Sequence, residues 1–267
     1  MIRAPAVSGR FYPSDKKKLA LEIEQYTASD HKKSVVRGCV VPHAGYMYSG
    51  HVAGAVYAAI EISARCILLG PRHFPGGEAI AIISEGSWQT PFGNAQIDTE
   101  LAAQLKQACP LLREDRVAHQ REHSLEVQIP FLQQLNANLR FVPVVLATNR
   151  YHELEALGHA VAKVIKAQND AVLVIASTDM NHYESDTITR AKDQKAIDRI
   201  LELDPRDLYD TVRAQDVTMC GYAATVAMLV AMRDLGAKQA ELVRYATSGD
   251  VTGDREEVVG YAGLIVR

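Results

Sequence analysis

Three histidines and one aspartate stand just after short apolar runs in this sequence, at His43, His73, Asp179 and His182. Neutral imidazole and carboxylate are standard ligands for first-row transition metals. Two histidines with one further ligand would leave open positions for a substrate or for O₂. A single loop histidine is more often a surface or capping residue, so the metal interpretation depends on distant segments converging. We expect His43 and His73 to bind one metal ion, with Asp179 as a further candidate ligand.

The elements that must position these residues are three apolar runs, 35–41, 66–69 and 171–176, which have the composition of β-strands. In open α/β sheets, ligands bind outside the carboxyl ends of parallel strands. If the three strands are parallel, the loops after them therefore share one crevice. In that crevice Asp179 and His182 would take catalytic roles, and His182 would move protons.

Cys220 lies at the start of a stretch with helical period, residues 219–235. The unpaired amides and the positive dipole at a helix N-terminus favour a thiolate, which could bind metal or act as a nucleophile. A buried apolar cysteine is the alternative, and the residues alone do not separate the two. The other three cysteines fit structural positions. Without a C-x-x-C pair or a secretory leader, the cysteines suit a reducing compartment, so we expect a cytoplasmic protein.

Three further side chains could contact a substrate in the crevice. Arg72 precedes His73 and could bind an anion through two parallel N–H donors, or could form a salt bridge with a carboxylate. Tyr46 comes three residues after His43 and could reach a bound ligand, in a catalytic or a substrate-binding role. Trp88 is a candidate substrate contact, although aromatic side chains more often pack into the walls of a site.

His123 and Glu126 are three residues apart, so on a helix they would project from the same side. Glu126 could then orient His123 toward the crevice, as hydrogen-bonded carboxylates do around metal ligands. The spacing could equally reflect capping, because Ser124 is a candidate N-cap for a helix over residues 124–135.

Apolar runs of strand length alternate with stretches of helical period along the whole chain. This alternation predicts an α/β sandwich around a mixed central sheet, in a single domain over residues 1–267. Ser14 is the expected cap of the first helix. Pro143 interrupts the run 141–146, which predicts an edge strand or a bulge at that point.

Composition and charge exclude several classes of protein. With 267 residues, 48% of them hydrophobic and 23% charged, the chain has the composition of a globular protein and not of a disordered one. Its 29 Lys and Arg against 32 Asp and Glu give a formal charge of −3, so no overall basic field exists to hold nucleic acid or an anionic membrane. The most apolar long stretch, residues 222–232, is far shorter than the about 20 residues of a membrane span. We expect neither nucleic acid nor a membrane as a partner.

Six ordered motifs resemble those of the MEMO family. They are Pro42-His43-Ala44-Gly45-Tyr46, Gly70-Pro71-x-His73, Thr90-Pro91-x-Gly93, Glu122-His123-Ser124-Leu125-Glu126, Ser177-x-Asp179-x-x-His182 and Cys220-Gly221. The resemblance runs from near residue 8 to the C-terminus. In prokaryotes it is to protein B of the AmmeMemoRadiSam system, which is encoded beside an AMMECR-type protein and a radical-SAM protein, so these two are candidate partners.

The resemblance implies a fold like that of the class III extradiol dioxygenases, which are non-haem iron enzymes. It also implies that the crevice ligands are two histidines and a cysteine, which match His43, His73 and Cys220, with Asp179 and His182 alongside. The dioxygenases use two histidines and a glutamate instead. Because thiolate is a softer ligand than carboxylate, the implied cofactor is one transition metal ion, Fe(II) or copper(I).

Three functions of different classes remain open. The first is a metal-dependent oxidoreductase, dioxygenase-like in architecture, that acts on an unknown small molecule. The second is a binding module that captures a phosphopeptide or another anion through Arg72 and the histidines, without catalysis. The third is a hydrolase or transferase with Cys220 as nucleophile and His182 or His43 as base. Metal content separates the first from the other two.

Overall fold

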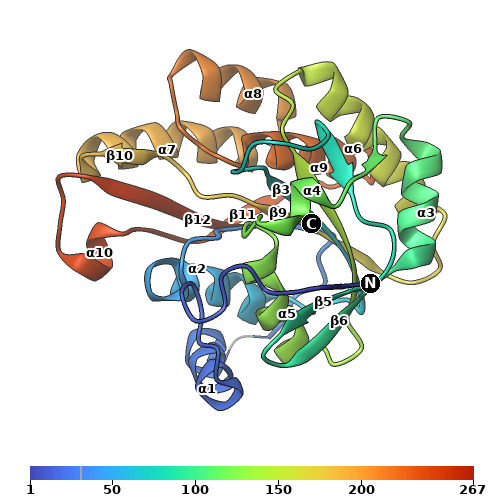
Figure 1. Cartoon of the computed structure of the whole chain (residues 1–267). Coiled ribbons are helices and arrows are strands. Elements are labelled where there is room, and N and C mark those ends of the chain that lie inside the picture. Colours follow the sequence, from blue (N-terminus) through green and yellow to red (C-terminus); the bar gives the residue numbers. More distant parts are fainter. Residues whose placement is uncertain (31) are drawn as a thin grey trace.

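One mixed β-sheet organises the molecule (Figure 1). The computed structural model describes residues 1–30 and 32–267. The strands in these residues are β1 (Ile2–Arg3), β2 (Gly38–Val41), β3 (Arg65–Pro71), β4 (Ile80–Ile82), β5 (Ser87–Thr90), β6 (Gly93–Ile97), β7 (Arg113–Glu114), β8 (Arg140–Leu146), β9 (Val172–Ser177), β10 (His182–Glu184), β11 (Ala240–Thr247) and β12 (Val258–Val266). They pair in the order β1-β5-β6-β8-β3-β9-β2-β12-β10, with β11 beside β12, β4 beside β8 and β7 beside β4.

The helices lie on both faces of this sheet. They are α1 (Lys16–Thr27), α2 (Tyr46–Ala59), α3 (Thr99–Ala108), α4 (Val117–Gln120), α5 (Ile129–Leu135), α6 (Tyr151–Lys166), α7 (Asp186–Leu201), α8 (Pro205–Ala214), α9 (Tyr222–Asp234) and α10 (Gly249–Thr252), with a 3-10 turn, η1, at Glu126–Gln128. Figure 1 shows α1, α2 and α5 below the sheet, and α6, α7, α8 and α9 above it. Within the described residues, no helix is both long enough and apolar enough to span a bilayer.

The four central strands are parallel, and this decides where the candidate site residues lie. β8, β3, β9 and β2 run in the same direction, and β12 runs antiparallel to β2. Val41 lies opposite Ser177, and Leu69 lies opposite Ala176. The carboxyl ends of β2, β3 and β9 therefore meet at one edge of the sheet, as the sequence predicts.

The central strands are apolar on both faces because each face is covered by helices. In β9, Val174 belongs to the core between the sheet and helices α6 and α9. Its neighbour Ile175 belongs to the core on the opposite face, between the sheet and helices α1 and α2. On one face Gly54 of α2 allows a close approach of α1, since a Cβ at that position would lie 2.5 Å from the backbone oxygen of Tyr26. The α/β sandwich with a mixed sheet is confirmed.

Pro143 corrects the expectation of an edge strand or bulge, because β8 is an interior strand. On one side β8 pairs along its full length with β3, where Pro143 lies opposite Leu68. On its other side, β6 pairs only with residues 140–141 and β4 only with residues 144–146. Pro143 falls in the gap between these partners, where a residue without an N–H is tolerated.

Three predicted element boundaries are also corrected. Asp15, not Ser14, caps α1, and its carboxylate accepts the N–H of Lys18. The strand expected over residues 35–41 begins at Gly38, and the helix expected over residues 219–235 spans Tyr222–Asp234. Helix ends are set by such local hydrogen bonds, which apolar periodicity does not resolve.

Candidate metal centre

Three histidines from separate segments meet at the carboxyl ends of the parallel strands. His43 follows β2, His73 follows β3, and His123 lies in the loop before η1. One ring nitrogen from each falls within 4.8 Å of the other two. The ring centroids are 5.2 Å apart for His43 and His73, 5.6 Å for His43 and His123, and 4.5 Å for His73 and His123. The convergence of His43 and His73 agrees with the sequence, whereas the sequence placed His123 only beside the site.

Cys220 contacts the same cluster. Its Sγ lies 3.3 Å from Nε2 of His43 and accepts the backbone N–H of Asp179 at 3.3 Å. Gly221 allows this approach, because a Cβ there would lie 2.3 Å from the backbone oxygen of Ser177. The loop before α9 can therefore lie directly against the end of β9.

The hydrogen bonds of Ser177 fix the proton of the His43 ring on Nδ1. The Ser177 hydroxyl donates to the carbonyl of Ser124 at 2.6 Å and accepts from Nε2 of Gln128 at 2.9 Å. Its one proton is thus used, so the 3.0 Å contact with Nδ1 of His43 requires an N–H on that nitrogen. The Nε2 atom that faces Cys220 then carries a free lone pair, which is the form that binds metal.

Glu122 fixes the tautomer of His73 in the same way. Its buried carboxylate faces Nδ1 of His73 at 2.9 Å and accepts the backbone N–H of His73 at 2.6 Å. The backbone amides of His123 and Ser124 also donate to it, at 2.9 and 2.8 Å. Burial alone would raise the pKa of Glu122, but the hydrogen bonds and charge of His73 lower it to about 2. No role for Glu122 was expected from the sequence, in which the one signal is its position directly before His123 in the motif.

Glu126 does not orient His123, so that expectation is wrong. Its carboxylate accepts hydrogen bonds from four donors in the N-terminal segment: Nη1 of Arg3, the N–H groups of Ala6 and Val7, and the Tyr12 hydroxyl. Glu126 therefore anchors the N-terminal segment.

Ser124 is not a helix cap either. Its hydroxyl donates to the carbonyl of Pro71 at the end of β3. The expected helix over residues 124–135 is instead the 3-10 turn η1 followed by α5, with Pro130 in the first turn of α5.

Asp179 and His182 lie beside the cluster, in the loop after β9 and at the start of β10. Oδ1 of Asp179 accepts the backbone N–H of His43 at 2.7 Å, and Oδ2 lies 3.9 Å from Nε2 of the same histidine. Nδ1 of His182 faces the backbone carbonyl of Thr218 at 2.9 Å, which requires a proton on Nδ1 and leaves Nε2 free.

Burial sets the protonation of the centre. It lowers the pKa of His43 well below the ordinary range, and the neighbouring His73 lowers it further. Burial also lowers the pKa of His123 and raises that of Asp179. The imidazoles of His43 and His123 are therefore neutral near pH 7, which is the form that binds metal.

The pKa of the Cys220 thiol is raised, whereas its place near a helix N-terminus predicted that a thiolate would be favoured. Burial raises its pKa, and the negative charge of Asp179 raises it further. Gly221 is the N-cap of α9 and Cys220 precedes it, so the helix dipole does not offset this burial. Without a bound cation, Cys220 is a neutral thiol.

The three proposed substrate contacts lie away from the histidines or are already bonded. The hydroxyl of buried Tyr46 donates to the carbonyl of Val127 at 2.7 Å. Nη1 of Arg72 donates to three backbone carbonyls of its own loop, at residues 76–78. Trp88 is 1% exposed, packs edge-on against Phe141 and lines a different cavity. The Tyr46 hydroxyl and Nη1 of Arg72 are thus already bonded within the protein, and Trp88 lies in another cavity.

Comparison with known proteins agrees with the motif resemblance. The sequence matches the family described as Memo-like protein over residues 3–265. It is 40% identical to the MEMO1 family protein MK0963 of Methanopyrus kandleri, across 100% of this chain and 99% of that protein. It is also 40% identical to the MEMO1 family protein MTH_45 of Methanothermobacter thermautotrophicus, across 99% of this chain and 100% of that protein.

Among solved structures, the uncharacterized protein JW3007 from Escherichia coli K12 has a TM-score of 0.59 at 10% identity, and the match covers 86% of this chain and 99% of that one. At this identity the likeness shows a shared fold alone. The family match, by contrast, spans nearly the whole chain and is supported by relatives aligned over nearly their full length. The chain belongs to the Memo-like protein family.

Proposed function

We propose that this protein binds one transition metal ion, Fe(II) or copper(I), through His43, His73 and Cys220, and uses it in a redox reaction of a small molecule. The observation that carries the proposal is the shared orientation of the two histidines. Each has its Nδ1 proton held by a protein acceptor, Ser177 or Glu122, which leaves Nε2 as the nitrogen available to a metal ion. Such hydrogen bonds typically orient metal-bound imidazoles.

The donor spacing fits a bound ion. Metal bonds of about 2.0 Å to nitrogen and about 2.3 Å to sulfur place the two atoms about 3.5 Å apart in a tetrahedral site. The observed separation of Nε2 of His43 and Sγ of Cys220 is 3.3 Å. The ring nitrogen of His123 lies within 4.8 Å of those of His43 and His73, so His123 could complete a four-donor set or replace Cys220 in a three-histidine set.

The donor types narrow the choice of metal. A thiolate among imidazoles favours copper(I), zinc or iron over the hard ions magnesium and calcium. A bound Fe(II) or copper(I) ion would supply one-electron chemistry toward O₂ or an organic substrate. Two nearby groups would handle protons: His182 through its free Nε2, and Asp179 through a carboxyl whose pKa is raised by burial. Candidate partners are an AMMECR-type and a radical-SAM protein, and the ligand of the crevice would be a small molecule or a peptide.

A second candidate function follows from the same 3.3 Å contact between Cys220 and His43. A thiol beside an imidazole with a free Nε2 could act as a nucleophile and base pair in a hydrolase or transferase. The third candidate function, an anion-binding module, depended mainly on Arg72. It is less favoured because Nη1 of Arg72 already donates hydrogen bonds to its own loop.

The deciding experiment is anaerobic purification followed by elemental analysis of the native protein and of His43→Ala, Cys220→Ala and His123→Ala. We expect about one ion per native chain and near-zero metal in His43→Ala. Loss in Cys220→Ala with retention in His123→Ala assigns the thiolate set, and the reverse assigns the three-histidine set. His159→Ala is the matched control, since this histidine is 56% exposed and pairs with Asp234 on the surface. Equal, near-zero metal in all variants and in the native protein, including after anaerobic loading, would remove the proposal.

A further inference from the structure

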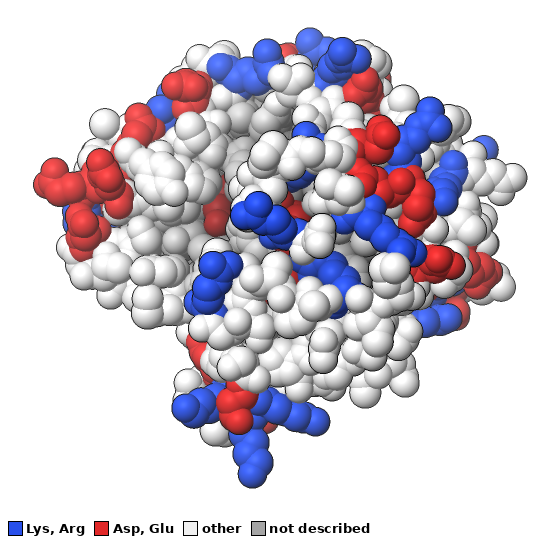
Figure 2. All heavy atoms as spheres, in the orientation of Figure 1, with Lys and Arg blue, Asp and Glu red and all other residues white. Residues whose placement is uncertain are grey.

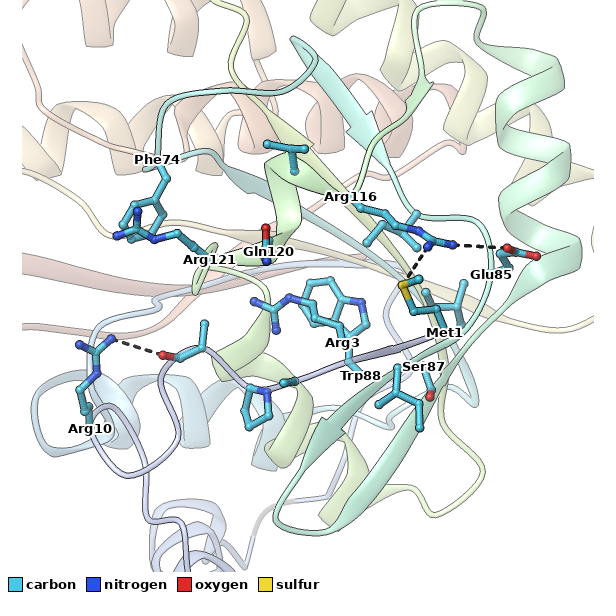
Figure 3. A pocket seen from close by; sticks show the side chains of 17 residues that line it. Met1, Arg3, Arg10, Phe74, Glu85, Ser87, Trp88, Arg116, Gln120 and Arg121 are labelled. Carbon is cyan, nitrogen blue, oxygen red and sulfur yellow. Dashed lines mark hydrogen bonds and ion pairs between the residues drawn. The ribbon is translucent and has the colours of Figure 1, made fainter.

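A second cavity lies beside the N-terminal strand, apart from the metal centre (Figure 3). Its volume is about 680 Å³, within the range of about 300–1,000 Å³ that is usual for small-molecule sites. Its walls come from the N-terminal segment, from β5 and from the region of α4. None of His43, His73, His123 and Cys220 is among its lining residues. The cavity is therefore a separate candidate site.

The walls of this cavity are mainly apolar. Ile2, Pro5, Ile83, Trp88, Ile97 and Val117 are among the residues that line it. Nε1 of Trp88 is one of two buried polar side-chain atoms in the described residues that lack a hydrogen-bond partner. Large apolar walls with few polar groups are typical of pockets that enclose the body of an organic ligand.

The charged side chains around the cavity are mostly positive. Four arginines line it, Arg3, Arg10, Arg116 and Arg121, against a single carboxylate, Glu85. Figure 2 shows blue side chains gathered around the middle of this face, over the region where Figure 1 places α4 and the N-terminus. The chain as a whole is slightly acidic, with a formal charge of −3. The surroundings of the cavity are therefore positively charged, although the chain as a whole carries a net negative charge.

Of the four arginines, Arg3 is the one whose three guanidinium nitrogens all donate hydrogen bonds within the protein. Its guanidinium donates to the backbone carbonyls of His119 and Glu122 and to the carboxylate of Glu126, at 2.6 to 2.7 Å. The same group lies 4.0 Å from the centre of the Trp88 ring. Arg3 therefore forms a fixed part of the wall.

Two of the other arginines retain free donors. Arg116 is held by Glu85 at 3.5 Å. Arg10 makes one long hydrogen bond of 3.3 Å to a backbone carbonyl, and Arg121 lies over the ring of Phe74 at 4.6 Å. No carboxylate among residues 1–30 and 32–267 forms an ion pair with either of them. Figure 3 shows Arg10 and Arg121 at one end of the cavity, with Met1 and Trp88 toward the other.

We propose that this cavity binds a small organic anion. Its apolar body would lie along Trp88 and the aliphatic side chains, and its carboxylate, phosphate or sulfonate would meet the guanidinium groups of Arg10 and Arg121. Arginine suits this role because its planar group donates parallel hydrogen bonds to an oxyanion and remains charged at all working pH values. Phe74 follows His73 and lines the cavity, so the cavity and the metal centre share this loop.

The test uses two fluorescent probes that differ in charge. One is 1-anilinonaphthalene-8-sulfonate, and the other is N-phenyl-1-naphthylamine, which has the same ring system without the sulfonate. Each is titrated into the native protein, the double variant Arg10→Gln/Arg121→Gln, and the control Arg233→Gln, which removes an exposed arginine at the end of α9. Val117→Trp enlarges a side chain that lines the cavity, and Val251→Trp is its control, at the 44% exposed Val251 on α10. Thermal unfolding verifies that each variant folds.

We expect the native protein to bind the sulfonate about tenfold more tightly than the neutral probe. The double arginine variant should lose this preference while its affinity for the neutral probe stays the same. Val117→Trp should weaken both probes, and the two controls should bind like the native protein. Equal native affinities for the two probes, or an unchanged sulfonate affinity in the double variant, would overturn the anion site even if Val117→Trp fails to fold. Unchanged binding in a folded Val117→Trp would show that the probes bind elsewhere and would overturn it as well.

Discussion

The carboxylate of Glu122 binds His73 at two points, with Oε2 accepting the backbone N–H at 2.6 Å and Oε1 facing the ring Nδ1 at 2.9 Å. This pair fixes both the position of the loop after β3 and the orientation of the imidazole that it carries. Because Oε1 also accepts the amide of His123, a single buried carboxylate holds two histidines of the cluster in place.

Glu122→Gln should weaken metal binding about 10- to 100-fold, because the amide cannot accept from every donor around it and the His73 ring loses its orientation. Anaerobic titration with Fe(II) by calorimetry measures the effect. Glu61→Gln, at an exposed carboxylate two residues after the end of α2, is the control and should bind like the native protein. Native-like affinity in Glu122→Gln would show that this carboxylate only holds the loop.

Cys220→Ser should weaken copper(I) binding more than Fe(II) binding, because a hydroxyl replaces the soft donor while the imidazoles remain. Bound metal should also protect Cys220 from alkylation, and metal uptake should release a proton, since burial raises the pKa of this thiol. Mass spectrometry of alkylated protein with and without metal measures the protection. The three other cysteines are almost fully buried and act as internal references.

Undiminished labelling of Cys220 at saturating metal would exclude it from the metal site. The site would then consist of His43, His73 and His123, and the nucleophile function would gain support.

Glu126→Gln should lower the free energy of unfolding by about 3 kcal/mol, because it leaves the guanidinium of Arg3 without its buried partner. Urea denaturation measures the loss, and faster proteolysis near Arg10 would report the release of the N-terminal segment. Metal affinity should remain within about twofold of native. A drop as large as that of Glu122→Gln would instead restore a role for Glu126 in supporting His123.

Asp193 should make the stability depend on pH. Burial raises the pKa of its carboxyl from 3.8 to about 6, although it accepts hydrogen bonds from Tyr245 and the amide of Asn181. Between pH 4 and 6 the folded state holds a proton that the unfolded state has lost, so stability falls as the pH rises through this window.

Asp193→Asn cannot titrate and serves as the reference for this effect. The difference in the free energy of unfolding between native protein and Asp193→Asn should shift by about 2–3 kcal/mol against the native protein from pH 4 to pH 7. Urea denaturation at several pH values measures it. A constant difference would mean that Asp193 has an ordinary pKa.

The sequence by itself determined the α/β class with a mixed sheet and the segments that carry the site, whereas the structure showed that the central strands are parallel. Buried parallel strands appear as continuous apolar runs because helices cover both faces, and His43, His73 and Asp179 follow such runs directly. The position of a residue after a parallel strand fixes the sheet edge at which it lies, so the convergence of His43 and His73 could be predicted.

Only the tertiary structure decided which partners the side chains have. Glu122 and Glu126 stand on either side of the same short motif, yet Glu122 binds His73 and Glu126 binds the N-terminal segment. The direction of each carboxylate depends on a partner far away in the sequence, 49 residues for Glu122 and His73 and 120 residues for Glu126 and Ala6, which local spacing does not encode. The pKa of Cys220 is a similar case, because burial outweighs the dipole of a helix that begins just after it. Burial of a particular atom is set by the whole fold, and so it could not be read from the chain.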